Sequence, residues 1–89
     1  MKTRSLRFTK AFKRDFKKYE LSQPLITVLY KLINNQVLDE KYRDHALTGD
    51  MAGYRDCHLK PDLLLIYRIN ETNNEVELLR LNTHSEIFG

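Results

Sequence analysis

The stretch LLLIYRI, residues 63–69, carries apolar side chains on both faces of an extended chain. A strand of this kind is typical of the centre of a sheet, because neighbouring structure must cover both of its faces. Two further strand candidates flank it, at residues 54–59 and 76–81. Residues 60–62 and 70–74 connect the three strands, and connections this short favour antiparallel hairpins. We therefore predict an antiparallel sheet with residues 63–69 at its centre.

Upstream of this sheet, the sequence predicts a short strand followed by a helix. Residues 5–9, SLRFT, alternate polar and apolar side chains, which would turn Leu6 and Phe8 toward the core. Thr9 is suited to cap a helix whose apolar residues recur at spacings of four and three. The apolar stripe consists of Phe12, Phe16 and Tyr19, and the outer face consists of Lys10, Lys13, Arg14, Lys17 and Lys18.

A second helix should begin at Pro24 and end near residues 34–35. Its apolar stripe comprises Leu25, Leu29, Leu32 and Ile33. Residues 36–52 then resemble a polar connection. The order strand, helix, helix and three strands predicts an α+β fold, in which a two-helix hairpin packs on one side of a small antiparallel sheet. Residues 1–89 should form a single domain.

The composition, with 42% hydrophobic and 30% charged residues, suits an ordinary globular protein. No apolar run approaches the roughly 20 residues that cross a bilayer, and the basic N-terminus lacks the apolar core of a secretory signal. The single cysteine, Cys57, cannot form an internal disulfide, which fits a reducing compartment. We therefore expect a cytoplasmic protein without a membrane partner.

Positive charge is concentrated near the N-terminus. Residues 1–20 contain eight Lys or Arg and two acidic residues, whereas residues 21–89 contain seven basic and ten acidic residues. Such an asymmetry attracts polyanions, but a plain solvated helix face would have the same composition. The charge pattern alone leaves both interpretations open.

The polar residues of the second half suggest a site on the sheet. The chain has three histidines, which are His45, His58 and His84. Asp56 precedes His58 by two residues, so both should project from one strand face, about 7 Å apart at the backbone. By the same alternation Lys60 shares that face. Arg80 has the parity of His84 on the last strand and its extension, so the two would converge with His58 if the faces coincide.

Two imidazoles, carboxylates and a guanidinium suit the cleavage of a phosphodiester. One group takes a proton from the attacking hydroxyl, a protonated imidazole supplies one to the leaving oxygen, and a cation stabilises the phosphoryl charge. RNA carries its own nucleophile, the 2′-hydroxyl, so we expect no metal or other cofactor. Zinc binding by the histidines and Cys57 is disfavoured, because Cys57 and His58 are adjacent on a strand and point to opposite faces.

Each candidate also has a structural interpretation. His45 would most simply be a hydrogen-bonded loop residue, and Asp62, after Pro61, a turn residue whose carboxylate binds nearby backbone. Arg80 interrupts an apolar strand, so it either pairs with an acid or reaches a ligand. Phe88 would either fold back onto the sheet or provide a stacking platform for an unpaired base.

Three motifs in this order closely resemble the YafQ-type toxins of bacterial type II toxin–antitoxin systems, a branch of the RelE/ParE superfamily. The first is Asp-His-x-Leu-x-Gly at residues 44–49, the second is Tyr-Arg-Asp-x-His-x-x-Pro-Asp at residues 54–62, and the third is Thr-His-x-x-Ile-Phe at residues 83–88. Together they account for all three histidines. In relatives an aromatic residue can follow the Pro-Asp pair, whereas Leu63 stands there in this chain.

The resemblance implies a ribosome-dependent endoribonuclease that cuts mRNA and is silenced by a cognate antitoxin, in a complex that is a higher-order hetero-oligomer. It implies that His84 is the general acid and that His58 acts with Asp56 or Asp62 on the base side. His45 would orient or contact the substrate. The implied substrate-binding residues are Arg80 for phosphate and Phe88 for a base. The strand alternation adds Lys60 as a further candidate for substrate binding.

Two alternatives to a ribosome-dependent nuclease stay open. A non-catalytic or differently targeted member of the same superfamily would bind its target through the basic helix, although a pure binder does not require the complete histidine set. A ribonuclease that acts without the ribosome would use the same site chemistry. The basic helix would then serve either ribosomal RNA or an acidic antitoxin segment.

Overall fold

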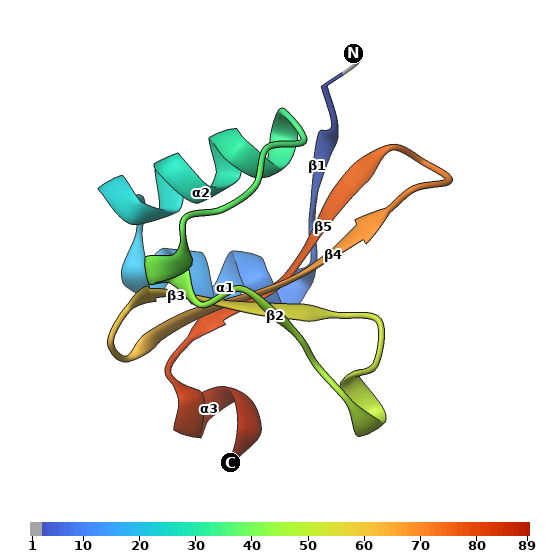
Figure 1. Ribbon diagram of the computed structural model, residues 1–89. Helices are drawn as coiled ribbons and strands as arrows, with labels where there is room; N and C mark the ends of the chain where they lie inside the picture. Colours follow the sequence, from blue (N-terminus) through green and yellow to red (C-terminus); the bar gives the residue numbers. More distant parts are fainter. Residues whose placement is uncertain (1–2) are drawn as a thin grey trace.

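The computed structural model describes residues 3–89 and contains one five-stranded sheet in the order β1-β5-β4-β3-β2 (Figure 1). The strands are β1 (Ser5–Phe8), β2 (His45–Ala46), β3 (Arg55–Lys60), β4 (Leu63–Asn70) and β5 (Glu75–Asn82). The α-helices are α1 (Lys10–Tyr19), α2 (Gln23–Ile33) and α3 (His84–Phe88), and the short 3₁₀ helices are η1 (Glu40–Tyr42) and η2 (Gly49–Met51). The α+β class predicted from the sequence is confirmed.

The strand predicted to lie at the centre of the sheet does so. β4 pairs antiparallel with β3 on one side and with β5 on the other, and residues 63–67 are all buried. The face toward α1 and α2 forms the core. It joins Phe12, Leu25, Val28 and Leu32 of the helices to Cys57, Leu65, Leu78 and Leu81 of the sheet.

The first strand differs from its prediction in two respects. β1 pairs parallel to β5, so the sheet is mixed and not purely antiparallel. Leu6 packs against the core as predicted, but Phe8 is 48% exposed, because the chain leaves the sheet there and enters α1. The ring of Phe8 instead contacts Phe12 at 5.7 Å between centroids.

The connection between α2 and β3 is more ordered than the sequence predicted. It contains η1, η2 and the two-residue strand β2, in which His45 pairs with Asp56 and Ala46 with Arg55. A strand of two residues is too short to produce an alternating pattern. Tyr42, in η1, is also buried in the core.

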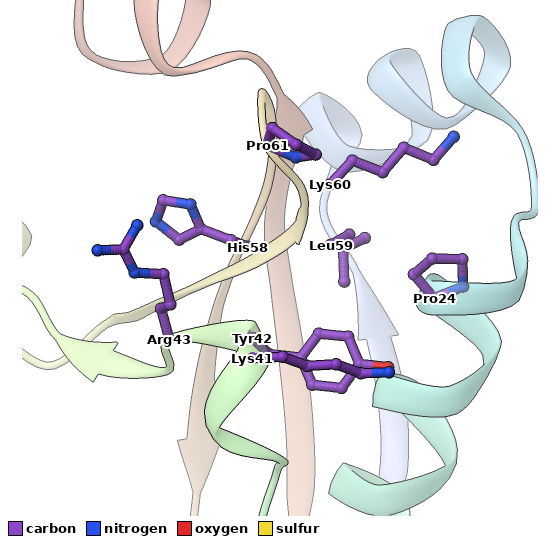
Figure 2. Close-up of a pocket in the computed structure, with 8 residues that line it drawn as sticks. All are labelled: Pro24, Lys41, Tyr42, Arg43, His58, Leu59, Lys60 and Pro61. Carbon is purple, nitrogen blue, oxygen red and sulfur yellow. The ribbon is translucent and has the colours of Figure 1, made fainter.

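A register shift lies near the end of β3, between His58 and Lys60. His58 pairs with Leu64, but Lys60 pairs with Leu63, so one extra residue is inserted and the alternation of the side chains changes. Figure 2 shows the consequence: His58 and Lys60 extend to opposite sides of the strand. The prediction that Lys60 shares a face with His58 is therefore wrong.

The predicted Thr9 cap of the first helix and the place of Pro24 at the start of the second helix are confirmed. The Thr9 hydroxyl accepts a hydrogen bond from the Phe12 backbone at the start of α1, and Pro24 lies in the first turn of α2. Figure 1 shows α2 above the sheet and α3 below it. Within residues 3–89, no helix has the length and apolar character that crossing a membrane requires.

A buried carboxylate, Asp15 of α1, joins this helix to the edge of β5 beyond the end of β1. Its oxygens accept hydrogen bonds from Arg80 Nε at 2.7 Å, the Leu81 backbone at 2.9 Å and Asn82 Nδ2 at 3.0 Å. Burial opposes the charge, but these hydrogen bonds outweigh it and lower the pKa of Asp15. The Asn82 oxygen in turn accepts from Tyr19 and from the backbone of Thr83, directly before α3.

Replacing Asp15 with Ala should lower the free energy of unfolding by about 3 kcal/mol, because Arg80 and the Leu81 backbone lose their partner. The lowered pKa of Asp15 means that its contribution is complete above its unfolded pKa of about 4 and is lost as pH falls through the lower, folded value. Urea unfolding at pH 7 and at pH 3 measures both effects. The matched control is Asp50→Ala, at an exposed acid, which should leave the unfolding midpoint unchanged. A wild-type midpoint for Asp15→Ala would contradict the stabilising role of Asp15.

Candidate active site

Four of the predicted site residues, from three different elements, line one cavity of about 320 Å³. They are His45 of β2, Asp56 of β3, and His84 and Phe88 of α3. β4 separates β3 from β5, so His84 reaches Asp56 only because the chain turns below the sheet after β5. The rest of the lining comes from the connection that contains η2, with Leu47, Thr48 and Met51.

Asp56 is the buried centre of this cavity, with a residue exposure of 4%. Its Oδ1 atom has no hydrogen-bond partner in residues 3–89. Burial raises the pKa of Asp56, while positive charge on His58, His45 and His84 acts in the opposite direction. A carboxylate that is buried, lies in the field of several imidazoles and lacks a partner for one oxygen is typical of a reactive site.

His45 is held in a defined orientation beside this carboxylate. Its Nδ1 lies 2.8 Å from the backbone oxygen of Arg43, and because a carbonyl only accepts, Nδ1 must carry the proton. Its Nε2 then points to Asp56, 3.7 Å from Oδ2. The ring of His58 lies 6.4 Å from that of His45 between centroids. His45 and His58 are therefore two neighbouring imidazoles, each of which can hold a proton in this part of the molecule.

The residue before His45 fixes the whole segment to the sheet. Asp44 accepts two hydrogen bonds from Arg55, each of 3.2 Å, and a third from the hydroxyl of the buried Tyr67. The hydrogen bond with Asp44 raises the pKa of Arg55, and burial together with Asp44 raises the pKa of Tyr67. In the Asp-His pair of the sequence, Asp44 therefore anchors the backbone and His45 faces the cavity.

His84 and Phe88 begin and end the short helix α3. Thr83 caps it through a hydrogen bond from the Glu86 backbone to its hydroxyl. The two rings lie 4.9 Å apart between centroids. Phe88 remains 39% exposed, so it lines the cavity beside His84 and keeps an open ring face. The interpretation that it folds back onto the sheet is not what the structure shows.

The other predicted site residues lie outside this cavity. Arg80 pairs with Asp15, which is the structural one of its two sequence interpretations, and this hydrogen bond raises its pKa. Asp62 is exposed in the turn between β3 and β4. His58 and Lys60 line a second, neighbouring cavity together with Arg43 (Figure 2).

Sequence reasoning missed three residues that shape the site: Asp15, Asp44 and Arg43. Asp15 was counted only as part of the charge balance of the first helix, although an acid in a lysine-rich helix, close to the stripe of Phe12 and Phe16, is a signal of a buried partner. The sequence indicated Asp44 only as part of a motif and gave it no role. The position of Arg43 beside the histidines depends on η1 and β2, and neither element was predicted.

Residues 4–89 match the model of a family described as the bacterial toxin of the type II toxin–antitoxin system, YafQ. The chain belongs to the YafQ family. The mRNA interferase toxin YafQ of Escherichia coli strain K12 is 36% identical to it over 83 residues, which cover 92% of this chain and 88% of the relative.

Solved structures of YafQ toxins and related proteins have the same fold. A metal-bound toxin from Helicobacter pylori is 41% identical, with a TM-score of 0.85 over 94% of this chain and 98% of the other. The YafQ toxin in the Escherichia coli DinJ–YafQ toxin–antitoxin complex is 32% identical, with a TM-score of 0.83 over 98% and 99%. These likenesses confirm the RelE-like fold and the family suggested by the three motifs.

In this YafQ-family chain, residues 3–89 contain no group of three or more His, Cys, Asp or Glu side chains arranged to hold a metal ion. His45 lies beside Asp56, with 3.7 Å between Nε2 and Oδ2. Cys57 is fully buried on the other face of β3, and burial raises its pKa. It therefore contributes to the core of the YafQ fold and not to the cavity.

Replacing Asp56 with Asn should stabilise the protein at pH 8. Because its pKa is raised, the ionised carboxylate costs folding free energy above its folded pKa. We expect a gain of about 1 kcal/mol, which is about 4–8 °C in Tm for a domain of this size. The gain should shrink as pH falls and the carboxyl group becomes protonated. Thermal unfolding at pH 8 and pH 4 measures this, and the exposed Asp62→Asn is the control; a lower Tm for Asp56→Asn at pH 8 would contradict it.

Proposed function

We propose that this protein is the toxin of a type II toxin–antitoxin system and that it cleaves mRNA on the ribosome, using the 2′-hydroxyl of the substrate as nucleophile. The family supports the toxin class, and a relative bears the name mRNA interferase toxin. Cleavage of message would stop translation and growth. No metal is required for this chemistry, because the RNA supplies the attacking group.

The observation that carries the proposal is the buried Asp56 in a cavity that it shares with His45 and His84, while His58 lies next to His45. A carboxylate in this position costs stability, since it is 4% exposed and one of its oxygens has no partner in residues 3–89. A structural role would not require such an arrangement. A general base does, because a raised pKa brings the proton affinity of the carboxylate closer to working pH.

In the proposed reaction, the base side of the site removes the proton of the 2′-hydroxyl, and the oxygen attacks the adjacent phosphorus. Asp56 and His58 form this side, and His45 stands beside the carboxylate, with its Nε2 atom 3.7 Å from Oδ2. The bond from phosphorus to the 5′-oxygen of the next nucleotide breaks. Protonated His84 then donates a proton to that leaving oxygen.

The remaining predicted site residues take supporting roles in the proposal. Phe88 has an open ring face beside His84 and would stack on an unpaired base. Arg80 would contribute positive charge at the phosphate from its place against Asp15. Asp62 stands at the turn that follows His58 and would join the base side when the substrate is bound.

His84→Ala should reduce cleavage at least 100-fold, because a positioned general acid contributes about 10²–10⁴ to the rate. Purified protein is added to a translating extract, and the 5′ ends of the cut message are mapped by primer extension. The matched control is Ser85→Ala, at the next and exposed position of α3, which should cut like the wild type.

A further outcome of this experiment and two companion experiments decide between the functions. Unchanged cleavage by His84→Ala would contradict the role of the imidazole. Growth arrest that persists in both His58→Ala and His84→Ala would favour a binding toxin without catalysis. Free mRNA incubated with the protein, with and without ribosomes, separates a ribosome-dependent nuclease from a general one: the proposal requires cuts only when ribosomes are present.

The cognate antitoxin should bind across α1. The outer face of this helix carries five exposed cations, and none of them pairs with an acid in residues 3–89. Beside them lies a groove of about 480 Å³ with apolar walls. Its lining residues are Phe8, Phe12, Lys13, Phe16, Lys17, Leu21 and Leu29. An acidic, amphipathic segment of the antitoxin would match both the exposed rings and the lysine rim.

Phe16→Ala should weaken antitoxin binding at least tenfold, because an aromatic anchor in such a groove is worth about 2 kcal/mol. The control is Tyr30→Ala on α2, since Tyr30 is an exposed aromatic outside the groove. Its affinity should stay within about twofold of the wild type. Titration calorimetry with the protein encoded by the adjacent reading frame measures both. Equal losses for the two variants would place the antitoxin elsewhere.

A further inference from the structure

A second cavity, of about 480 Å³, adjoins the candidate active site between residues 41–43, the end of β3 and the start of α2 (Figure 2). The buried residues Tyr42 and Leu59 belong to its wall. Its basic residues are Lys41, Arg43, His58 and Lys60, and none of the eight lining residues is acidic. Such a lining suits an anion.

No acid within residues 3–89 neutralises the three permanent cations of this cavity, although Lys41 Nζ lies over the Tyr42 ring, 5.3 Å from its centroid. Lys41, Arg43 and Lys60 are exposed, and none of them forms an ion pair within residues 3–89. Arg55 and Arg80, by contrast, are paired with Asp44 and Asp15. Because like charges held close together repel one another, the cluster favours binding of a polyanion that neutralises it.

Arg43 has an unusual backbone for its residue type. It adopts φ 51° and ψ 41°, the left-handed conformation, which costs free energy for a residue other than glycine and is most accessible to asparagine among the others. Its carbonyl orients His45, as described above. Asparagine or glycine would serve that backbone role better, so the large cationic side chain calls for a separate explanation.

The side chain of Arg43 lies next to a catalytic candidate. Figure 2 shows the guanidinium and the ring of His58 on the same side of β3, whereas Lys41 and Lys60 extend to the other side, toward α2. His58 in turn lies 6.4 Å from His45, between ring centroids, at the first cavity. The cations thus extend the charged surface next to the active site along the part of β3 that does not pair with β2.

We propose that Arg43 binds an RNA phosphate that neighbours the scissile one, and that Lys41 and Lys60 guide the backbone onward over the β3 edge. The inference rests on the proposed ribonuclease function and adds a subsite to it. Arg80 is held by Asp15 through both Nε and Nη2. Arg43 is therefore the guanidinium beside the histidines that is free of acid partners within residues 3–89, and a guanidinium suits bidentate contact with phosphate.

The test uses single-stranded RNA with 2′-O-methyl groups, which lacks the nucleophile and cannot be cut by the proposed chemistry. Arg43→Asn keeps a residue that accepts the left-handed backbone and removes the cation. It should raise the Kd for this RNA about tenfold at 100 mM salt, as expected for the loss of one charge-assisted contact. It should also reduce the slope of log Kd against log salt by about 0.7, the value for one phosphate on a single strand. Fluorescence anisotropy measures both quantities.

The matched control is Arg7→Asn, which removes the same charge from β1, at the opposite edge of the sheet from β2. It should bind RNA like the wild type. Arg43→Lys should recover part of the affinity and all of the lost salt slope, whereas a purely structural role of Arg43 would show as a lower Tm in Arg43→Asn. Wild-type affinity for Arg43→Asn, or equal losses for the Arg43 and Arg7 variants, would overturn the proposal.

A second arm identifies the source of the phosphate. Ribosomes carrying a 2′-O-methyl mRNA and ribosomes with an empty A site are each titrated with wild type and Arg43→Asn. A loss confined to the programmed ribosomes supports a phosphate of the mRNA. An equal loss on both would assign the contact to ribosomal RNA and overturn its place beside the scissile phosphate, and no loss on either overturns the subsite. The result is independent of the proposed cleavage, which fails separately if unmodified mRNA stays intact with the wild-type protein.

Discussion

The buried carboxylate of Asp15 joins helix α1 to the end of strand β5. It lies where β1 has ended and the β5 edge would otherwise have no partner, and it accepts hydrogen bonds from Arg80, Leu81 and Asn82. Asn82 then positions the backbone of Thr83, which caps α3. The place of His84 below the sheet therefore depends on an acid in the first helix, 65 to 67 residues away from its partners in the chain.

A second acid, Asp44, anchors the chain at the other edge of the sheet. Asp44 binds Arg55 and Tyr67, and so fixes the short strand that presents His45. With both edges anchored, Asp56 can remain buried at the centre with an oxygen that has no partner in residues 3–89. The hydrogen-bonded acids Asp15 and Asp44 support the scaffold, and the acid that lacks a partner for one oxygen, Asp56, lies in the site, which is the usual relation between a stable scaffold and a functional group.

Residue type alone does not separate structural from functional cations in this chain. Arg80 was the expected phosphate ligand, yet its guanidinium is held by Asp15. Arg43 was not among the site residues expected from the sequence. It stands beside His58 without an acid partner in the described residues (Figure 2). The difference lies in which acids the fold brings within reach, because an arginine with a buried carboxylate partner stabilises the native state and one without is available to a ligand.

The sequence by itself determined the α+β class, the central strand at residues 63–69, the Thr9 cap of the first helix, the start of the second helix near Pro24 and the three histidines as candidate site residues. Each of these depends on local periodicity or on side chains within a few residues, which a single sequence contains. Only the tertiary structure decided the parallel pairing of β1 with β5, the two-residue strand at His45, the bulge that turns Lys60 away from His58, and the partner of Arg80. These features depend on contacts between residues distant in the chain, and a shift of one residue in register reverses the face of every side chain that follows.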